Sequence, residues 1–284
     1  MNYHHDYHAG NFADVLKHVV LARVLTYMKQ KPKPFRVIDT HAGAGLYDLE
    51  GAEAAKTAEW QDGIARIFDA DLPKYVAELL EPYLDAVRSV NGAGLKAGLK
   101  YYPGSPLIAR HLMRDDDILV ANELAEAEFQ RLKQELRRAK STTVLNIDAR
   151  HAVKSLLPPK ERRGLVLIDP PFEEKSEFAD LATAVDDAMA RFATGTYLIW
   201  YPIKDEAAAD RFVAVATAKP GVEFLDVRLA VSKPFPGLGL TASGVLVLNP
   251  PFVLRAELET LMPCLESYLA EGSGSSFDIR IGVQ

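Results

Sequence analysis

The first strong pattern in the chain is a set of apolar residues spaced three and four positions apart, as is typical of an α-helix. The set consists of Val15, Leu16, Val19, Val20, Val24, Leu25 and Met28. Asp14 precedes most of it and is a suitable N-cap, and the KQKPKP segment that follows cannot continue a helix. The sequence therefore predicts a helix that begins near residue 14 and ends near residue 28.

Short apolar runs alternate with helical patterns over the rest of the chain. Strand-like runs occupy residues 35–39, 118–122, 142–147, 164–168 and 196–201, and two later runs, 223–231 and 244–248, flank a PFPGLGL loop. Helical patterns occupy residues 106–113, 125–140 and 178–192. Ser105 is the expected N-cap of the first of these helices. The alternation predicts an α/β fold with a mostly parallel central sheet and a late antiparallel hairpin.

One stretch interrupts this alternation, because the pattern is helical throughout residues 53–90. Its clearest apolar stripe consists of Val76, Leu79, Leu80, Leu84 and Val87. Pro73 suits the first turn of that helix, and the flexible segment NGAGLKAG leads back to the alternating pattern. We therefore predict a small helical insertion over residues 51–104, in a domain formed by residues 1–50 and 105–284.

Composition narrows the class of protein. Of the 284 residues 48% are hydrophobic, which is enough for a sizeable core, and the single cysteine, Cys264, excludes a disulfide framework. His4, His5 and His8 lie close together, but without nearby cysteines or a carboxylate pattern we expect no metal site. The start of the chain is too polar for a signal peptide, and no apolar run approaches the roughly 18 residues of a membrane span. We expect a cytoplasmic protein with no membrane contact.

The charge balance bears on nucleic-acid binding. With 33 Lys and Arg against 39 Asp and Glu, the formal net charge is −6, which argues against a protein that coats nucleic acid by bulk charge. Basic residues nevertheless cluster before the first strand (Lys29, Lys31, Lys33), on one helix (Arg131, Lys133, Arg137, Arg138, Lys140) and before the run 164–168 (Lys160, Arg162, Arg163). Each cluster is either a solvated face or part of a surface that contacts phosphates.

The run 35–39 ends in Asp39 and continues as a glycine-rich turn, DTHAGAG. Such a turn lets the backbone approach a nucleotide closely, although plain turn geometry explains it equally well. The dinucleotide fingerprint G-x-G-x-x-G is absent. The spacing of Asp39, Gly43 and Gly45 is nearer to the acidic, glycine-containing loop of S-adenosylmethionine (SAM) enzymes. Within this turn His41 is placed to face a ligand.

Further acids end neighbouring strands. Glu123 ends ILVANE and Asp148 ends TTVLNID, and each is either an ordinary solvated carboxylate or a ligand for a nucleotide. An acid after the second strand of such a sheet binds ribose hydroxyls, and the next one can accept from an adenine amino group. Because these strands and those that end at Asp39 and Asp169 are parallel, all four carboxylates are expected at one edge of the sheet. Ligands bind at that edge in open α/β folds.

The strongest chemical signal is the tetrapeptide Asp169-Pro170-Pro171-Phe172, directly after the buried run 164–168. Two prolines cannot continue a central strand, so they form a rigid turn. This arrangement suits methylation of a weakly nucleophilic amine such as adenine N6. Asp169 and the carbonyl of Pro170 can accept its two hydrogens and hold it in line with a methyl sulfonium, while Phe172 can stack on the base. The alternative is a turn that happens to contain two prolines.

A second motif of the same form, Asn249-Pro250-Pro251-Phe252, follows the run 244–248. It comes after the final hairpin, and no series of acid-ended strands leads to it. We interpret it as the end of a strand and the beginning of a C-terminal helix. The order of the elements, rather than the tetrapeptide itself, therefore selects Asp169.

With these residues in place, the chain resembles the RlmJ family of adenine-N6 methyltransferases, which act on large-subunit ribosomal RNA. The resemblance covers nearly the whole chain. It rests on the segments YHAGNFADVLKH (7–18), DTHAGAG (39–45), YYPGSPLIAR (101–110), RRGLVLIDPPFE (162–173), RFATGTYLIWYP (191–202) and TASGVLVLNPP (241–251).

The resemblance implies a Rossmann-like methyltransferase domain with a helical subdomain inserted after the first strand. It also implies SAM as the cofactor, contacted by His18, His41, Ser105, Glu123, Asp148, Ala149 and Asp169. Asp169 would then be the catalytic acceptor, and Tyr3 would lie near the RNA base. Two residues depart from the family pattern: Phe172 replaces the tyrosine of many members, and Ala149 replaces a common glycine.

The sequence thus predicts a SAM-dependent methyltransferase for the N6 amino group of an adenine in 23S ribosomal RNA. We expect a monomer that acts on RNA before its full assembly with proteins, without a metal, because the leaving thioether departs from a sulfonium that is already positive. The alternatives are a DNA adenine-N6 methyltransferase, which DPPF alone does not distinguish, and an RNA-binding protein that has lost catalysis. The missing fingerprint disfavours a dinucleotide-dependent oxidoreductase.

Overall fold

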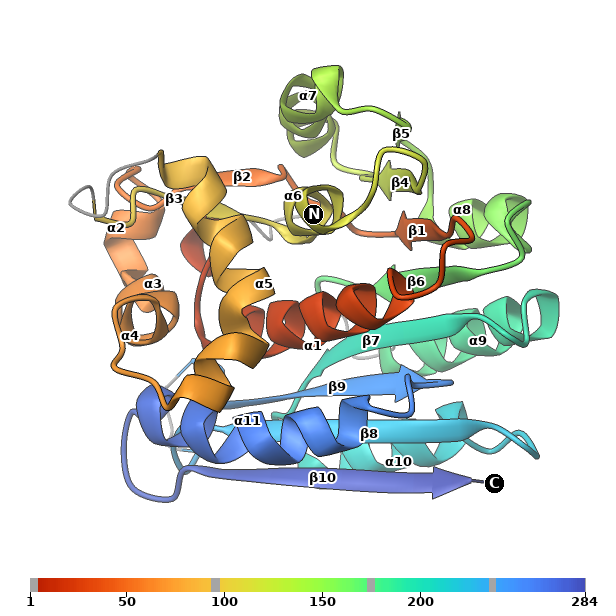
Figure 1. Cartoon of the computed structure of the whole chain (residues 1–284). Coiled ribbons are helices and arrows are strands. Elements are labelled where there is room, and N and C mark those ends of the chain that lie inside the picture. Colours follow the sequence, from red (N-terminus) through yellow and green to blue (C-terminus); the bar gives the residue numbers. More distant parts are fainter. Residues whose placement is uncertain (1–4, 93–97, 173–176, 235–238, 284) are drawn as a thin grey trace.

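The computed structural model of the chain describes residues 5–92, 98–172, 177–234 and 239–283. An eight-stranded sheet lies at its centre, with the strand order β10-β8-β9-β7-β6-β1-β4-β5 (Figure 1). In sequence order these strands are β1 (Arg36–Asp39), β4 (Ile118–Asn122), β5 (Thr142–Leu145), β6 (Gly164–Ile168), β7 (Thr196–Pro202), β8 (Glu223–Ala230), β9 (Ala242–Leu248) and β10 (Ser276–Val283). Strands β5, β4, β1, β6 and β7 pair in parallel, whereas β9, β8 and β10 pair antiparallel. The predicted mostly parallel α/β sheet with a late antiparallel hairpin is confirmed.

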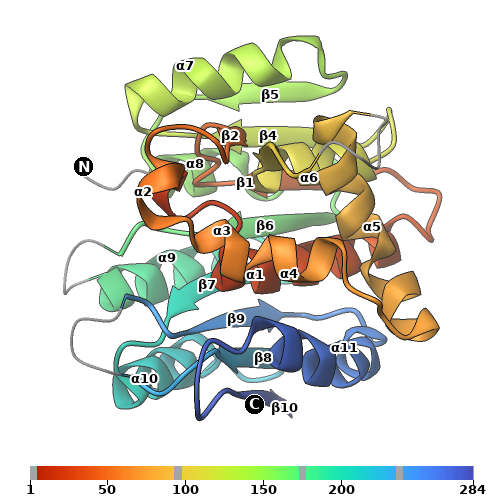
Figure 2. The same ribbon diagram turned by 90° about the vertical axis from the view of Figure 1, so that its left-hand side faces the viewer.

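Helices cover both faces of the sheet (Figures 1 and 2). One face packs against α1 (Phe12–Met28), α5 (Lys74–Asn91), α6 (Ser105–Leu112), α7 (Glu126–Glu135) and α11 (Leu254–Leu269), and the other against α8 (Ala149–Leu156), α9 (Glu177–Arg191) and α10 (Glu206–Ala216). Successive side chains of a strand point to opposite faces, so Val37 enters the first core and Ile38 the second. In the described part of the chain, no helix is both long and apolar enough to cross a lipid bilayer.

Helix α1 lies at the centre of the first core. Of its 17 residues, 15 are buried, because α5, α6 and α11 pack over the side that faces away from the sheet. Asn11 is the N-cap, since its Oδ1 accepts the backbone N–H groups of Ala13 and Asp14, each at 3.0 Å. The expectation that Asp14 caps this helix is therefore wrong. Its buried carboxylate instead bonds charged side chains of the cavity described below.

The chain between β1 and α6 contains several short elements. They are β2 (Leu46–Asp48), α2 (Ala54–Thr57), α3 (Glu59–Asp62), α4 (Ile64–Phe68), α5 and β3 (Tyr101–Pro103). Strands β2 and β3 pair with each other as a separate two-stranded antiparallel sheet. The 3-10 turns η1 (His5–Tyr7) and η2 (Leu136–Arg138) precede α1 and follow α7. The predicted helical stretch over residues 53–90 thus contains four helices, α2, α3, α4 and α5.

Gly63 determines how closely this helical stretch approaches the start of α1. A Cβ at Gly63 would lie 2.1 Å from the carbonyl oxygen of Gly10 and 2.7 Å from the Cα of Asn11. The Gly10 carbonyl also accepts the N–H of Ile64 at 2.8 Å, so the two segments cannot separate without weakening that hydrogen bond. A side chain at Gly63 must therefore displace the backbone.

We predict that Gly63→Ala lowers the free energy of unfolding by about 1–3 kcal/mol, the usual cost of overpacking. Urea unfolding followed by circular dichroism measures this change. Gly98→Ala is the control, because a Cβ at Gly98 meets nothing within 4 Å. Equal stability of the two variants would contradict the close backbone contact.

Candidate active site

A cavity of about 830 Å³ lies at the carboxyl ends of the parallel strands. Asp39, the fourth acid expected at this edge, is not among the described residues of its wall. The wall includes nine of the ten residues that the motifs and the family resemblance assign to catalysis, to the cofactor or to RNA: His18, His41, Ser105, Glu123, Asp148, Ala149, Asp169, Pro170 and Phe172. The tenth, Tyr3, lies outside the described residues. The parallel sheet therefore brings together residues that are far apart in the sequence, as the order of the strands predicts.

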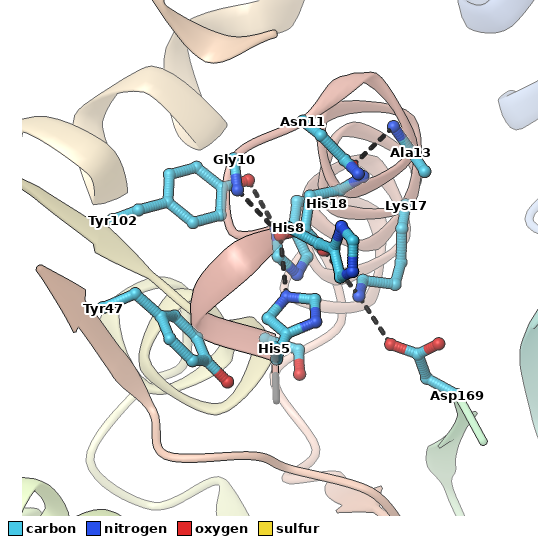
Figure 3. A network of polar contacts seen from close by, with 12 residues as sticks. His5, His8, Gly10, Asn11, Ala13, Lys17, His18, Tyr47, Tyr102 and Asp169 are labelled. Atoms are coloured by element: carbon cyan, nitrogen blue, oxygen red, sulfur yellow. Dashed lines mark hydrogen bonds and ion pairs between the residues drawn. The ribbon is translucent and has the colours of Figure 1, made fainter. Parts of the chain in front are cut away.

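Asp169 directly follows β6 and meets a lysine that sequence reasoning did not single out (Figure 3). Lys17 Nζ donates to Asp169 Oδ2 at 2.5 Å and lies 2.8 Å from Asp14 Oδ1. Only 5% of the Lys17 side chain is exposed. Burial disfavours its charge, but the attraction of the two carboxylates outweighs burial and holds the pKa of Lys17 above its ordinary value. The cation is thereby fixed between the two acids and orients Asp169.

Asp14 is the second acid of this group, and its side chain is almost fully buried. Its Oδ2 lies 2.9 Å from His5 Nε2 and accepts the backbone N–H of Gly10 at the same distance. Burial alone would raise the pKa of Asp14, but the positive charges of His5 and Lys17 hold it well below its ordinary value. Asp14 thus connects the segment before α1 to Lys17, and through Lys17 to Asp169.

The DPPF motif continues from Asp169 along the cavity wall. Phe172 has a φ of 51°, an uncommon value for a residue other than glycine. Its ring meets Trp200 of β7 edge-on, with 5.8 Å between centroids, and its centroid lies 5.1 Å from that of Phe178. An aromatic surface therefore belongs to the same cavity wall as the carboxylate of Asp169.

The second motif of this form lies elsewhere. Because β9 runs antiparallel to β7, Asn249 leaves the sheet at the edge opposite to Asp169. Asn249 Nδ2 donates to the carbonyls of Ala193 and Gly195 at 2.8 and 2.7 Å. Phe252 is 81% exposed, and neither Asn249 nor Phe252 is among the described residues of the cavity wall. The motif ends a strand shortly before α11, so the interpretation made from the order of the elements is confirmed.

Asp39 ends β1 and is fully buried. Ser105 Oγ donates to its Oδ2 at 2.6 Å, and the backbone N–H of His41 donates to its Oδ1 at 3.3 Å. Ser105 is the first residue of α6, and Gly104 is the N-cap, so the expectation that Ser105 caps this helix is wrong. Burial raises the pKa of Asp39 to about 7, and the negative charge of Asp169 contributes to the rise.

Glu123 closes the glycine-rich turn. Its Oε2 accepts the N–H of Gly43 at 2.9 Å, and its Oε1 accepts the N–H of Ala125 at 2.7 Å. Gly43 has a φ of +59°, and a Cβ there would lie 2.1 Å from the hydroxyl oxygen of Tyr47, so the turn requires glycine. Each carboxylate oxygen can accept more than one hydrogen bond. Glu123 can therefore bind ribose hydroxyls while it holds the turn.

Asp148 has a structural role in addition to its place in the cavity wall. It is the N-cap of α8, and its Oδ1 accepts the N–H groups of Arg150 and His151 at 3.0 and 3.2 Å. Ala149 is the first residue of the helix. The capping bonds use one oxygen of a side chain that is 52% exposed, so the other oxygen can accept from an adenine amino group.

His18 and His41, the two histidines of the wall that the family resemblance assigns to the cofactor, are uncharged. Burial lowers the pKa of His41 to about 4 and that of His18 to about 3. His41 Nδ1 lies 2.8 Å from Thr40 Oγ1, whose own hydrogen goes to the carbonyl of Leu167. His18 Nδ1 lies 2.7 Å from the hydroxyl of Tyr102. Both rings therefore offer neutral hydrogen-bonding groups to a ligand.

The basic clusters do not form the wall of this cavity. Among its described residues the lysines are Lys17 and Lys204, which belong to none of the three clusters. Two of the clusters precede β1 and β6, at the edge of the sheet opposite the cavity. In the cluster on α7, Arg131 pairs with Asp6 at 2.9 Å. None of the three clusters therefore contributes a basic side chain to the described wall of the cavity.

The residues of the wall suit an adenosine-containing cofactor. Carboxylates at successive strand ends match its hydroxyl and amino groups, and the volume lies within the roughly 300–1,000 Å³ that is usual for small-molecule sites. His18 Nε2 is buried and has no hydrogen-bond partner among the described residues, so a ligand can supply one. No group of three or more His, Cys, Asp or Glu in the described ranges is arranged to hold a metal ion.

Known proteins resemble this chain over nearly its whole length. A family model described as "Ribosomal RNA large subunit methyltransferase D, RlmJ" matches residues 32–279. The "Ribosomal RNA large subunit methyltransferase J" of Haemophilus influenzae is 41% identical over 277 residues, or 97% of this chain and 96% of that protein. Its Escherichia coli namesake is 41% identical over 270 residues, or 95% and 94%. A crystal structure of a Legionella pneumophila protein is 33% identical, covers 97% of this chain and 98% of its own, and gives a TM-score of 0.86.

We predict that Asp39→Asn stabilises the protein more at pH 8 than at pH 5. In the unfolded chain this carboxyl has a pKa of about 4 and is ionised at both pH values. In the folded protein its pKa is about 7, so the group is neutral at pH 5 and must ionise in a buried place as the pH rises. Ionisation of Asp39 therefore lowers the free energy of unfolding of the wild type by roughly 2 kcal/mol between pH 5 and pH 8. The Asn variant does not ionise and keeps its stability over this interval. Urea unfolding at both pH values measures the difference, and a difference independent of pH would contradict the raised pKa.

Proposed function

The chain belongs to the RlmJ family of large-subunit ribosomal RNA methyltransferases, and we propose that it methylates the N6 amino group of an adenine in 23S ribosomal RNA with SAM as the methyl donor. The family resemblance predicted from the sequence motifs is confirmed. The observation that carries the proposal is that Asp169, held by Lys17, faces the same cavity as Glu123 and Asp148. One cavity thus offers groups for an adenosine cofactor and for the amine of a second base.

The cofactor is assigned to the wall at the ends of β5, β4 and β1. Asp148 and the adjoining Ala149 would hold the adenine, and Glu123 would hold the ribose hydroxyls. His41, Ser105 and His18 lie toward Asp39, where the rest of the cofactor would extend. When bound, SAM supplies a methyl group that is activated by a positively charged sulfur.

Asp169 and Pro170 are assigned to the substrate amine. The bond from Lys17 uses Oδ2 of Asp169, so Oδ1 is the oxygen that can accept from adenine N6. The carbonyl of Pro170 is the second acceptor, because N6 carries two hydrogens. Two fixed acceptors orient the nitrogen and increase its electron density. When N6 takes the methyl group, the bond between that group and sulfur breaks, and its electron pair stays on sulfur in a neutral thioether. N6 must lose one proton, and the Oδ1 that accepted its hydrogen bond can take that proton.

Phe172 is assigned to the flat face of the target base. A base must leave its stack to reach a buried carboxylate, at a cost of a few kcal/mol. Stacking on an aromatic ring offsets part of that cost. For an adenine in a loop or hairpin the cost of leaving the stack is smaller. The ring of Phe172 is held by Trp200 and Phe178, so the aromatic surface does not have to be ordered when the base arrives.

The proposed substrate places the protein in the cytoplasm, together with ribosomal RNA. A target base that has to enter a cavity is more accessible before ribosomal proteins cover the RNA, so we assign the reaction to RNA that is not fully assembled. All the residues that the proposal uses belong to one chain, and a monomer is sufficient for it.

We predict that Asp169→Asn lowers methyl transfer by at least about a hundredfold, the lower end of the range for positioned acid–base groups. Binding of SAM should persist, because the amide oxygen can still accept from Lys17 and preserve the fold. Transfer of a labelled methyl group to protein-free 23S ribosomal RNA measures the first effect, and calorimetry the second. Asp187→Asn, on the surface of α9, is the matched control. Turnover near that of the wild type would rule out the role assigned to Asp169.

The two proline motifs provide a matched pair of phenylalanine variants. Stacking on a base is worth about 1–3 kcal/mol, so Phe172→Ala should lower kcat/KM for RNA by about tenfold or more. Phe252→Ala should leave kcat/KM unchanged, because Phe252 is 81% exposed and belongs to the motif at the opposite edge of the sheet. Steady-state kinetics with a 23S ribosomal RNA fragment measure both values. Equal values for the two variants would contradict the stacking role.

A further inference from the structure

One ring nitrogen of His18 has a hydrogen-bond partner, and the other has none among the described residues. The residue is 1% exposed and belongs to the wall of the cavity. Its Nδ1 lies 2.7 Å from the hydroxyl of Tyr102. Its Nε2 is buried and makes no hydrogen bond to any described residue. A buried polar atom of this kind is rare in native structures unless a ligand completes it.

Two buried tyrosines determine which nitrogen of His18 carries the hydrogen. The hydroxyl of Tyr102 lies 3.0 Å from that of Tyr83, and both side chains are fully buried. Tyr83 comes from α5 and Tyr102 from β3, so the chain of three groups connects the helical insertion to the cavity. Each hydroxyl has one hydrogen and the neutral ring has one, so the two hydrogen bonds can be arranged in three ways, and Tyr102 donates to His18 in only one of them.

The arrangements differ in the place of the unused hydrogen. If His18 Nδ1 donates to Tyr102, the unused hydrogen is on Tyr83 or on Tyr102, and neither hydroxyl has an acceptor for it among the described residues of the core. If Tyr102 donates to His18 Nδ1 instead, Tyr83 donates to Tyr102, and the unused hydrogen is on Nε2. That hydrogen belongs to a residue of the cavity wall, where a ligand can accept it. Only this last arrangement satisfies every donor of the three groups once the cavity is filled.

We propose that Tyr83 and Tyr102 are positioning residues that hold His18 in its Nε2–H form, so that it donates a hydrogen bond to the carboxylate of the methionyl part of SAM. Burial lowers the pKa of His18 to about 3, so the ring is neutral at physiological pH. A neutral ring carries its hydrogen on either Nδ1 or Nε2. Asp14 raises this pKa but does not overcome the effect of burial, and Lys17 and His5 lower the pKa further.

The place of His18 in the cavity wall selects the carboxylate of SAM as its partner. His18 follows Lys17, whose ammonium group bonds Asp169 at the end of β6, and it belongs to the same wall as Ser105, which bonds Asp39 at the end of β1. The adenine and ribose are assigned to the ends of β5 and β4, farther along the sheet. The methionyl part therefore lies nearest to His18. Its ammonium group can only donate, so its carboxylate is the group that accepts from Nε2–H.

This proposal rests on the proposed function for its ligand, but its first test needs no ligand. Two-dimensional ¹⁵N–¹H spectra of the histidine side chains in the full-length protein distinguish the two neutral forms. We expect His18, assigned by comparison with His18→Gln, to be in the Nε2–H form in the wild type. In Tyr102→Phe that preference should be lost. A wild-type ring in the Nδ1–H form would overturn the proposal, whatever the protein binds.

The second test compares two ligands that differ in the amino-acid part. S-Adenosylhomocysteine carries the carboxylate, whereas 5′-methylthioadenosine keeps the adenosine and sulfur and lacks the amino-acid part. Tyr102→Phe should weaken binding of the first ligand by about tenfold, the size of one hydrogen bond to a charged group, and binding of the second by less than about twofold. Tyr83→Phe should have a smaller effect in the same direction. Isothermal calorimetry measures all the affinities.

Tyr197→Phe is the matched control, because the hydroxyl of Tyr197 is buried in the other core and donates to the carbonyls of Ala188 and Phe192. It should change neither affinity. Equal weakening of both ligands by Tyr102→Phe would show a merely structural role and overturn the proposal, as would no weakening of either ligand. If the wild type bound neither ligand, the proposed function would fail, and the spectra would still decide the form of His18. If Tyr102→Phe did not fold, Tyr83→Phe and the wild-type spectra would provide the test.

Discussion

The ammonium group of Lys17, buried between two carboxylates, is the interaction on which the site depends. A buried charge is tolerated only when partners replace its hydration, and Lys17 has Asp14 on its own helix and Asp169 at the end of a strand. The same contact joins α1 to the sheet at the point where the proline-containing turn begins. Because one oxygen of Asp169 is committed to Lys17, the other has a defined direction. The carboxylate is thereby arranged before any substrate binds, as catalysis by fixed polar groups requires.

Much of the cavity could be predicted from the order of apolar runs, because the ends of parallel strands share one edge of a sheet. That rule, applied to DTHAGAG and DPPF, places Asp39 and Asp169 at one edge, and in the structure the charge of Asp169 acts on Asp39. It also separated Asp169 from Asn249, since a strand that pairs antiparallel ends at the other edge. The roles of His18 and Ser105 came from the family resemblance alone. No known spacing rule selects these two residues from the sequence.

The remaining features depend on contacts that the linear pattern does not contain. Lys17 meets Asp169 across 152 positions, and the only signal in the sequence is a pair of opposite charges three residues apart in a mostly apolar helix. The link from Tyr83 and Tyr102 to His18 requires side-chain directions in three elements. Strands β2 and β3 have three residues each, too few for a visible alternation, and β10 is an edge strand with mostly exposed side chains. The two N-caps were predicted wrongly because two nearby residues suit the same N-cap position in each case. These are Asn11 and Asp14 for α1, and Gly104 and Ser105 for α6.

We propose above all that the cavity at the strand ends presents an adenine amine of ribosomal RNA to the methyl group of SAM. The most direct measurement is to incubate the wild-type protein and SAM with protein-free 23S ribosomal RNA and to map every methylated nucleotide. The account predicts methylation at N6 of an adenine in an accessible loop or hairpin. Methylation of another atom or base, or transfer to DNA but not to the RNA, would contradict it.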